Sequence, residues 1–298
     1  MVDLSIIILS YNTSDVTERC LCSLYKALSL QGKLSCEVIV VDNGSKDKSV
    51  EMLQGLKRNL YLSNCTLQLI LLDQNTGYPK GNNIGLLSSK GKYILFLNSD
   101  IIVDDMNFKV LLEYFEKNIN VGALTVRVNL PSGTIDPASH RGFPTVWNSF
   151  CYYFKLEQLF KNIPYFKRIF GGYHLVDKDL NRIHEVDSPT GAFYLTRKSI
   201  MDAINGFDET FFMYGEDLDM SFRIKELGYS IIYFPKYQVL HLKYSSGIKI
   251  KDSLISKKTK GYFYDAMKIF FDKHYKSRYP SFIRYIVFLF IDLKYRFS

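Results

Sequence analysis

Two groups of carboxylates in this sequence are candidates for chemistry. The first is the triplet Asn98-Ser99-Asp100, which directly follows an apolar run at residues 93–97. An aspartate with small polar neighbours suits a hard divalent cation, because Mg²⁺ prefers oxygen ligands and also binds diphosphate. The alternative is that the triplet forms a turn or caps the next helix. These residues alone leave both interpretations open.

The second group is Glu216, Asp217 and Asp219, which fall in the first turn of a predicted helix. Acids there stabilise a helix through its dipole, and Asp219 can pair with Arg223 four residues later. That structural role does not explain why glycine and aromatic residues directly precede the acids. The group therefore stays a candidate site.

A single histidine, His241, follows a predicted strand near the end of the apolar pattern. Such a histidine is more often a satisfied structural residue than a ligand. Near a carboxylate-bound metal ion, however, its imidazole would supply a further coordination position.

The elements that must position these residues are strands alternating with helices. Apolar runs at 4–9, 37–41, 67–72 and 93–97 predict strands, and helical patterns begin near residue 14 and cover 82–89. This alternation indicates βαβ units and a parallel sheet. Later strands are predicted at 230–234 and before His241.

Polar residues follow each of the first four predicted strands, at what should be the same edge of the sheet. They are Tyr11, Asn12, Asp42, Asn43, Asn75, Asn98, Ser99 and Asp100. Ligands bind at this edge in open α/β sheets, so we predict a nucleotide cleft. No Walker sequence and no Gly-x-Gly-x-x-Gly follows the first strand, which leaves a metal ion and backbone groups to hold phosphates.

Composition and cysteine usage favour a cytoplasmic protein with one large domain or one domain and an appendage. The chain has 298 residues, of which 47% are hydrophobic. Residues 1–9 lack a basic region before a long apolar stretch, so no signal peptide is expected there. Five cysteines, an odd number without a Cys-x-x-Cys pair, fit buried thiols in a reducing compartment.

The positive charge is concentrated near the C-terminus. Residues 251–298 contain eleven Lys or Arg and four Asp or Glu, a net charge of +7 out of +8 for the chain. Such a segment suggests an anionic partner, and no nucleic-acid-binding motif accompanies it. Residues 282–293 are apolar but shorter than the roughly 20 residues that span a bilayer. They fit an interfacial membrane helix, or a helix that packs on the catalytic domain or a second subunit in a homodimer.

Aromatic residues are dense between residues 143 and 173, where eleven of 31 residues are Phe, Tyr or Trp. Core packing is the first explanation for this density. A surface for a partner, an acceptor or a bilayer is the alternative.

Together these segments resemble the family 2 inverting glycosyltransferases with the GT-A fold, most closely their bacterial rhamnosyltransferase-like branch. The resemblance runs from about Leu4 to His241. It rests on the order of short motifs, namely Ser-Tyr-Asn (10–12), Val-Asp-Asn-Gly-Ser (41–45), Asn-Thr-Gly-Tyr-Pro-Lys-Gly-Asn-Asn-Ile-Gly (75–85), Leu-Asn-Ser-Asp (97–100), Gly-Ala-Phe (191–193), Gly-Phe-Asp-Glu (206–209) and Phe-Phe-Met-Tyr-Gly-Glu-Asp-Leu-Asp (211–219).

The resemblance implies an α/β fold with a mainly parallel central sheet flanked by helices and a helical C-terminal appendage. A catalytic domain would cover residues 1–245, with nucleotide binding in about 1–100 and acceptor binding in about 101–245. Residues 246–298 would form a basic, aromatic helical tail.

The resemblance also implies site residues. Tyr11 and Asp42 would contact the nucleoside base, and Asn75, Asn82 and Asn98 would line the nucleotide pocket. Family members often carry arginine where Asn82 stands, which puts a phosphate contact there in doubt.

Metal and sugar contacts follow from the same comparison. Asn98-Ser99-Asp100 replaces the usual Asp-x-Asp, so Asp100 would be the carboxylate ligand of Mg²⁺ or Mn²⁺, with His241 as a further ligand. Thr190, Gly191 and Glu216 would sit beside the donor sugar.

Asp217 matches the family's general base. It would take the proton of an acceptor hydroxyl as that oxygen attacks the anomeric carbon and the nucleoside diphosphate leaves. The expected reaction is transfer of L-rhamnose from dTDP-rhamnose to a saccharide or lipid-linked acceptor in cell-surface polysaccharide synthesis, at the inner face of the membrane. Alternatives are a UDP-hexose or UDP-N-acetylhexosamine donor, and a non-catalytic saccharide-binding protein. A sugar-1-phosphate nucleotidylyltransferase would need a glycine-rich loop after the first strand, where Ser-Tyr-Asn-Thr-Ser stands instead.

Overall fold

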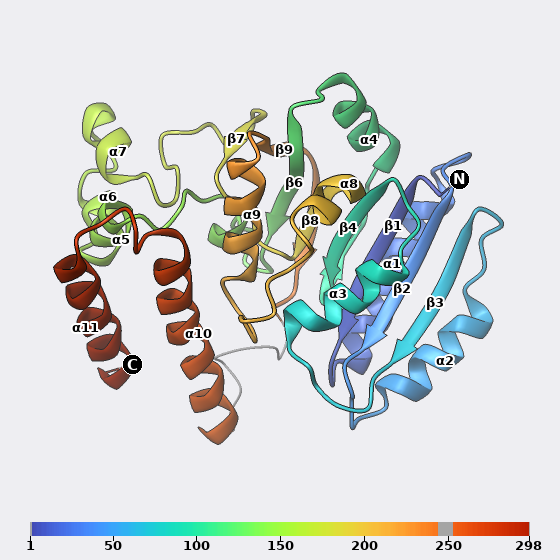
Figure 1. Ribbon diagram of the computed structural model, residues 1–298. Helices are drawn as coiled ribbons and strands as arrows, with labels where there is room; N and C mark the ends of the chain where they lie inside the picture. The colour runs from blue at the N-terminus through green and yellow to red at the C-terminus, as the bar shows by residue number, and fades with distance from the viewer. Residues whose placement is uncertain (1, 244–252, 298) are drawn as a thin grey trace.

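A central sheet begins with four parallel strands. The computed structural model describes residues 2–243 and 253–297. In it β1 (Leu4–Ser10), β2 (Cys36–Asp42), β3 (Cys65–Leu71) and β4 (Tyr93–Asn98) pair in the order β3-β2-β1-β4 (Figure 1). The four predicted strands are thereby confirmed, with bounds shifted by one or two residues. β1, β2 and β4 are buried on both faces, which explains their unbroken apolar sequences.

The rest of the sheet is mixed rather than parallel. β8 (Phe193–Arg197) is antiparallel to β4 and to β6 (Val121–Asn129), and β9 (Ser230–His241) is parallel to β6. The two short strands β5 (Ile101–Ile102) and β7 (His184–Val186) are antiparallel to β9.

Strand β9, the last along the chain, includes both the predicted strand at 230–234 and the predicted strand before His241. Its register against β6 shifts between Val126 and Arg127, where Pro235 and its neighbours bulge out of the ladder. A proline cannot donate to a ladder, so the apolar pattern breaks although the strand continues.

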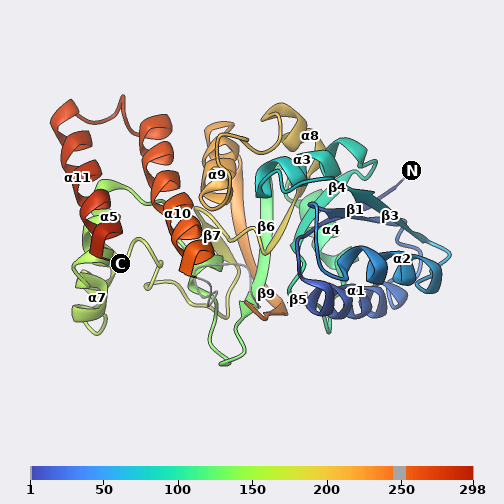
Figure 2. The same ribbon diagram turned by 90° about the horizontal axis from the view of Figure 1, so that it is seen from below.

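Helices cover both faces of the sheet (Figure 2). On one face α1 (Ser14–Ser29), α2 (Ser49–Asn59) and α4 (Phe108–Lys117) share a hydrophobic core with β1, β2 and β4. On the other face lie α3 (Tyr78–Ser88), α8 (Lys198–Ala203) and α9 (Glu216–Glu226). The α/β fold class predicted from sequence is confirmed. α3 begins four residues before the predicted start at Asn82, because Pro79 is well suited to a first helical turn.

A third group of helices lies beside the sheet, at the left of Figure 1. It contains α5 (Val146–Tyr153), α6 (Leu156–Leu159), α7 (Pro164–Phe170), α10 (Ser253–His274) and α11 (Ser281–Phe297). Phe270 and Phe271 of α10 share a core with Phe211 and Phe222. Packing on the protein, one of the alternatives for the C-terminal segment, therefore holds for α10. Across the described part of the chain, no helix combines the length and apolar character that crossing a bilayer requires.

Candidate active site

The ends of β1 and β2 bring Tyr11 and Asp42 to neighbouring strands. Ser10 pairs with Asp42 in the parallel register, so Tyr11 follows directly beside it. Asp42 is 1% exposed, and its Oδ1 accepts a hydrogen bond from the Ser45 backbone N–H at 2.8 Å. Its Oδ2 is buried without a hydrogen-bond partner in the described chain. This carboxylate oxygen can accept a further hydrogen bond.

Asn75 and Asn82 are engaged within the protein. Asn75 Oδ1 accepts from Asn43 Nδ2 at 3.1 Å and from the Gly77 N–H at 2.9 Å, which shapes the loop before α3. Gly77 has a φ of 90°, and a Cβ there would lie 2.7 Å from the carbonyl oxygen of Phe212. Asn82 is 1% exposed and donates to the Tyr78 carbonyl. Both asparagines therefore hydrogen-bond within the protein, in the loop before α3 and in its first turn.

The hydroxyl of Tyr78 contacts candidate residues at the end of β4 and in the loop before β8. It donates to Asn98 Oδ1 at 2.9 Å and lies 3.3 Å from the Gly191 carbonyl oxygen. Burial raises the pKa of Tyr78 well above its usual value, and negative charge nearby raises it further. The charged neighbours responsible are Glu216, Asp217 and Asp100. Carboxylates from two separate parts of the chain thus act on one hydroxyl group.

Asp100 and His241 come together because Ile101 of β5 pairs with His241 of β9. His241 Nε2 lies 3.3 Å from Asp100 Oδ1, and its Nδ1 lies 2.9 Å from Asp136 Oδ2. All three side chains are nearly buried. Burial lowers the pKa of His241, but its hydrogen bonds to Asp100 and Asp136 outweigh burial and raise it to about 9. Asp136 was marked in the sequence only by its place in a turn-forming Asp-Pro pair.

A divalent cation beside Asp100 would bind His241 Nε2 only after displacing the proton that the raised pKa keeps there. A ligating histidine usually donates its other ring N–H to a carboxylate, which is the place of Asp136. Within residues 2–243 and 253–297, no group of three His, Cys, Asp or Glu side chains is arranged to hold a metal ion. The protein would thus supply two ligands, and phosphate oxygens and water the others, as is usual for Mg²⁺.

Asp217 lies at the start of α9 and is held by three donors. Arg141 Nη2 lies 2.6 Å from its Oδ2, and the Gly191 N–H donates to the same oxygen at 3.2 Å. The Leu218 N–H donates to Oδ1 at 2.8 Å. A carboxylate has about four lone-pair positions. Two of the three donors contact Oδ2, and Oδ1 accepts from the Leu218 N–H.

Arg141 is a residue that the sequence analysis missed. Burial opposes the charge of its guanidinium group, but Asp217, Tyr173 and Asp136 together outweigh burial and raise the pKa of Arg141. Its Nε is buried and has no partner within the described residues. The only signal in the sequence was an arginine at the edge of the aromatic segment, with no spacing that relates it to Asp217.

Glu216 and Asp219 have opposite environments. Glu216 is 8% exposed, and its Oε2 has no partner in the described part of the chain. Burial first, and then the charge of Asp217, raise the pKa of Glu216 to about 8. Asp219 is fully buried and pairs with Arg223 at 2.7 Å, which confirms the pairing predicted from sequence. Glu216 therefore faces the site as a neutral acid at pH 7, and Asp219 is structural.

Thr190 completes the turn beneath the site. It is 9% exposed, and its Oγ1 accepts from the Ala192 N–H at 3.3 Å. The candidate residues thus comprise a buried acceptor after β2, a carboxylate–imidazole pair at β5 and β9, and two adjacent carboxyl groups at the start of α9. These groups have the chemistry to accept hydrogen bonds from a ligand and to remove a proton from a hydroxyl group.

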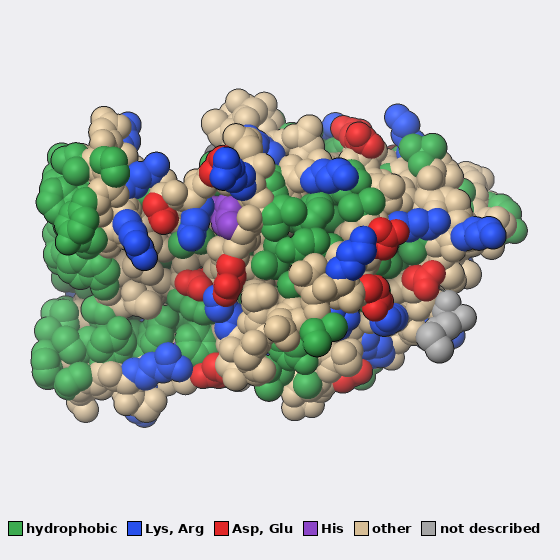
Figure 3. All heavy atoms as spheres, turned by 90° about the horizontal axis from the view of Figure 1, so that it is seen from above, with side chains coloured by type: hydrophobic (Ala, Val, Ile, Leu, Met, Phe, Trp, Pro, Cys, Tyr) green, Lys and Arg blue, Asp and Glu red, His purple; other side chains and the backbone are tan. Residues whose placement is uncertain are grey.

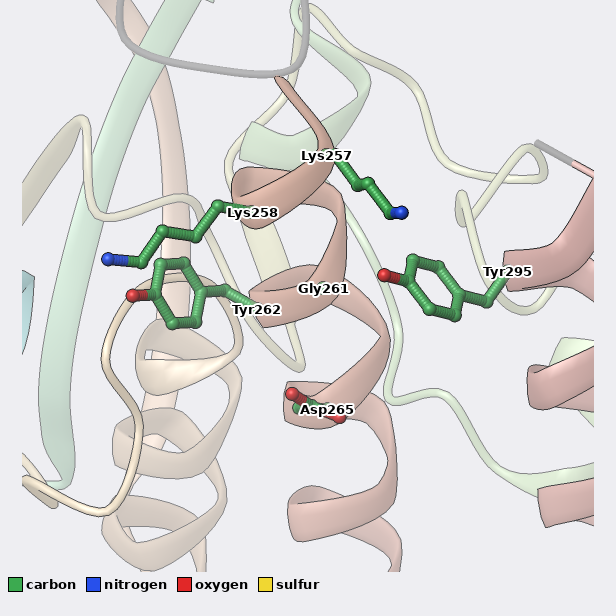
Figure 4. A pocket seen from close by; sticks show the side chains of 6 residues that line it. All are labelled: Lys257, Lys258, Gly261, Tyr262, Asp265 and Tyr295. Carbon is green, nitrogen blue, oxygen red and sulfur yellow. The ribbon is translucent and has the colours of Figure 1, made fainter. Parts of the chain in front are cut away.

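Helix α10 flanks this site without carrying any of the predicted residues. The Tyr262 ring stacks on Phe212 at 4.5 Å, and the Phe212 carbonyl accepts from the Tyr78 N–H. A pocket of about 370 Å³ lies between α10 and α11 (Figure 4). Its lining residues are Lys257, Lys258, Gly261, Tyr262, Asp265 and Tyr295. None of the candidate residues at the strand ends or on α9 lines this pocket. We therefore base the proposed chemistry on those residues and not on the pocket.

Comparison with known proteins points to one family. The sequence model of Glycosyl transferase family 2 matches residues 5–176, more than half of the chain, and that of Glycosyl transferase family group 2 matches residues 165–290. The rhamnosyltransferase WbbL of Escherichia coli is 26% identical over 229 residues, 68% of this chain and 82% of WbbL. The N-acetylglucosaminyl-diphospho-decaprenol L-rhamnosyltransferase of Mycobacterium tuberculosis is 24% identical over 80% of this chain and 76% of its own length.

Other relatives are longer than this chain. The chain spans about half the length of the poly-beta-1,6-N-acetyl-D-glucosamine synthase of Staphylococcus epidermidis, which is 23% identical over 78% of this chain.

Solved structures share the fold. S. aureus TarS 1-349 in complex with UDP-GlcNAc gives a TM-score of 0.56 at 17% identity, over 90% of this chain and 65% of that one. GalNAc-T7 with UDP, GalNAc and Mn²⁺ gives 0.59 at 15% identity, over 81% and 44%. The GT-A fold expected from sequence is confirmed.

Proposed function

The chain belongs to glycosyltransferase family 2, and from this premise we propose that it transfers L-rhamnose from dTDP-rhamnose to a saccharide or lipid-linked acceptor. Two rhamnosyltransferases among its relatives support the sugar, and the decaprenol-linked substrate named for the mycobacterial relative supports a lipid-linked acceptor. A role in cell-surface polysaccharide synthesis at the inner face of the membrane would follow.

The single observation that carries the proposal is the position of Asp217. Its Oδ2 is held by Arg141 and by the backbone of Gly191, and its Oδ1 accepts from the Leu218 N–H. We propose that Asp217 takes the proton of the acceptor hydroxyl. The hydroxyl oxygen then forms a bond to the anomeric carbon, and the bond from that carbon to the diphosphate oxygen breaks on the opposite face. This single displacement inverts the anomeric centre, and the electron pair leaves with the nucleoside diphosphate.

The donor would bind across the strand ends. Asp42 Oδ2 is placed to accept an N–H of the nucleoside base, and the exposed ring of Tyr11 can stack on that base. Asp100 and His241 would hold Mg²⁺ or Mn²⁺. When bound, the cation would offset charge on the leaving diphosphate. Asn98, Thr190, Gly191 and Glu216 would contact the diphosphate or the sugar.

A second donor class has its own support. The UDP-GlcNAc complex of TarS and the N-acetylglucosamine polymer synthase among the relatives favour a UDP-N-acetylhexosamine donor. The fold accommodates either donor, so the choice depends on residues that contact the sugar.

A panel of nucleotide sugars separates these candidates. Purified protein is incubated with each sugar and Mg²⁺ or Mn²⁺, with and without lipid-linked acceptors, and nucleoside diphosphate release is followed. We expect release from dTDP-rhamnose to exceed release from UDP-linked sugars and to stop with EDTA. Faster release from UDP-N-acetylglucosamine would replace the first donor by the second.

A further inference from the structure

Helix α11 has two apolar faces, of which only one is buried. Ile283, Val287 and Phe288 pack against the core shared with α10. The other face carries Phe282, Tyr285, Ile286, Leu289, Leu293 and Phe297, each between 42% and 86% exposed. These residues recur every three or four positions, so they form one stripe along the helix. A helix at a protein surface normally turns a polar face outward.

The outer stripe of α11 continues onto α5. The Tyr153 ring of α5 lies 4.0 Å from the Phe290 ring of α11, between centroids. Trp147, Phe150 and Phe154 of the same region are about half exposed. We call the α11 stripe together with these three residues the apolar end. Figure 3 shows hydrophobic side chains covering this end of the molecule, at its left.

An open groove interrupts the apolar end. It has a volume of about 350 Å³ and is lined by Val146, Trp147, Phe150 and Tyr279. All of its lining residues are apolar or aromatic, and none belongs to the strand ends. A groove of this character accommodates a hydrocarbon chain better than a polar segment.

Several exposed basic residues lie on the elements that carry the apolar end or in the turns beside them. The exposed basic residues of α11, α5–α7 and the turns beside them are Lys155, Lys161, Arg168, Lys276, Arg278, Lys294 and Arg296. Of the nearby acids, Glu157 is buried against His174, Asp292 is paired with Lys268, and Glu226 of α9 is paired with Arg278. The basic residues, which form the positive rim of the apolar end, therefore outnumber these acids.

We propose that the apolar end is a docking surface for an anionic lipid bilayer, into which α11 and the α5 aromatics insert without crossing it. Aromatic rings and aliphatic side chains would enter the acyl boundary, and the surrounding cations would meet lipid phosphates. A second copy of the chain fits less well, because a symmetric contact would bring two positive rims together. This docking goes beyond the proposed sugar transfer and does not depend on the donor.

Vesicle flotation with the full-length chain tests the proposal. We expect binding to vesicles of phosphatidylcholine and phosphatidylglycerol, weaker binding to phosphatidylcholine alone, and release by salt. The double variant Ile286→Glu/Leu289→Glu should bind the anionic vesicles at least about tenfold more weakly. Lys276→Gln/Arg296→Gln should weaken binding to anionic vesicles only.

A matched control places the same change elsewhere. Leu30 and Ile119 are 77% and 74% exposed and lie outside the apolar end. Leu30→Glu/Ile119→Glu should bind vesicles as the wild type does, and thermal melting should show both double variants folded.

Two results would overturn the proposal. One is equal flotation of the wild type and Ile286→Glu/Leu289→Glu. The other is a wild type that does not float but forms a dimer in light scattering, which the same double variant dissociates. The second result would assign the apolar end to a contact between copies of the chain.

Discussion

Arg141 and Asp217, which are 76 positions apart in the sequence, form an almost buried salt bridge with 2.6 Å between Nη2 and Oδ2. Each side chain is 12% exposed. The bridge links the start of the aromatic segment to the first turn of α9. The backbone of Arg141 is held in place, because its carbonyl accepts hydrogen bonds from the Asp187 and Ser188 N–H groups. The orientation of the proposed base therefore depends on a residue outside its own helix.

Replacing Arg141 should lower turnover more than donor affinity. Arg141→Gln leaves the Asp217 carboxylate buried without its cation, and misplacing a catalytic group slightly can cost about 10²-fold in rate. Breaking a buried pair also destabilises by about 3 kcal/mol. We expect kcat to fall with KM for the donor nearly unchanged, and Arg141→Lys to recover part of the loss. Arg182→Gln, which breaks an exposed pair with Asp179, is the control for both measurements. Equal kinetics for the two glutamine variants would contradict a positioning role.

Replacing Asp217 should separate binding from chemistry. Asp217→Asn keeps the size of the side chain but cannot take a proton, and a general base contributes about 10²–10⁴-fold. We expect donor affinity by calorimetry to stay near that of the wild type while transfer falls by that factor. Asp202→Asn, at an exposed pair with Lys198, should leave both unchanged. Normal turnover of Asp217→Asn would remove Asp217 from the role of base.

Glu216 should make the folded protein less stable as the pH rises. Its pKa is raised from 4.5 to about 8, so the folded state keeps a proton that the unfolded chain has already released. Stability contributed by this proton is complete below pH 4.5 and is lost as the pH rises to about 8. Urea unfolding across this range should show a smaller decline for Glu216→Gln, which carries no titratable group. Parallel declines in the two proteins would show that Glu216 is not the source.

Replacing Asp100 or His241, the proposed cation ligands, should weaken donor binding in the presence of the metal ion. Asp100→Ala and His241→Ala each remove one of the two proposed protein ligands, so Mg²⁺ or Mn²⁺ should no longer strengthen donor binding. Asp136→Asn leaves both ligands but weakens the support of His241, for which about 10–100-fold in metal affinity is typical. Calorimetric titration of the donor with and without the metal ion measures each effect. Unchanged metal dependence in Asp100→Ala would contradict the assignment.

Sequence patterns located the strands better than the contacts between distant segments. β1, β2 and β4 were predictable because strands buried on both faces have unbroken apolar sequences. The continuity of β9 was not predictable, since its bulge at Pro235 breaks the pattern. Asp100 and Asp217 were found because each lies at the end or start of an element.

The partners of these two acids escaped sequence reasoning. Arg141 and Asp136 lie in loops without periodicity, and their contacts to Asp217 and His241 exist only after the chain has folded. Likewise, α11 has apolar residues on two faces, and its sequence alone does not reveal which face packs on α10.

Asp219 should stabilise the packing of α10 against α9. It is fully buried at α9, and its Oδ1 lies 2.8 Å from His274 Nε2 and 2.7 Å from Lys273 Nζ, both on α10. Asp219→Asn removes the charge from this cluster and should destabilise the fold by about 3 kcal/mol. Asp272→Asn breaks a more exposed pair with Arg284 in the same helices and should cost about 1 kcal/mol or less. Denaturant unfolding of the two variants measures both values. An equal, small loss in both would mean that the aromatic core alone holds α10 in place.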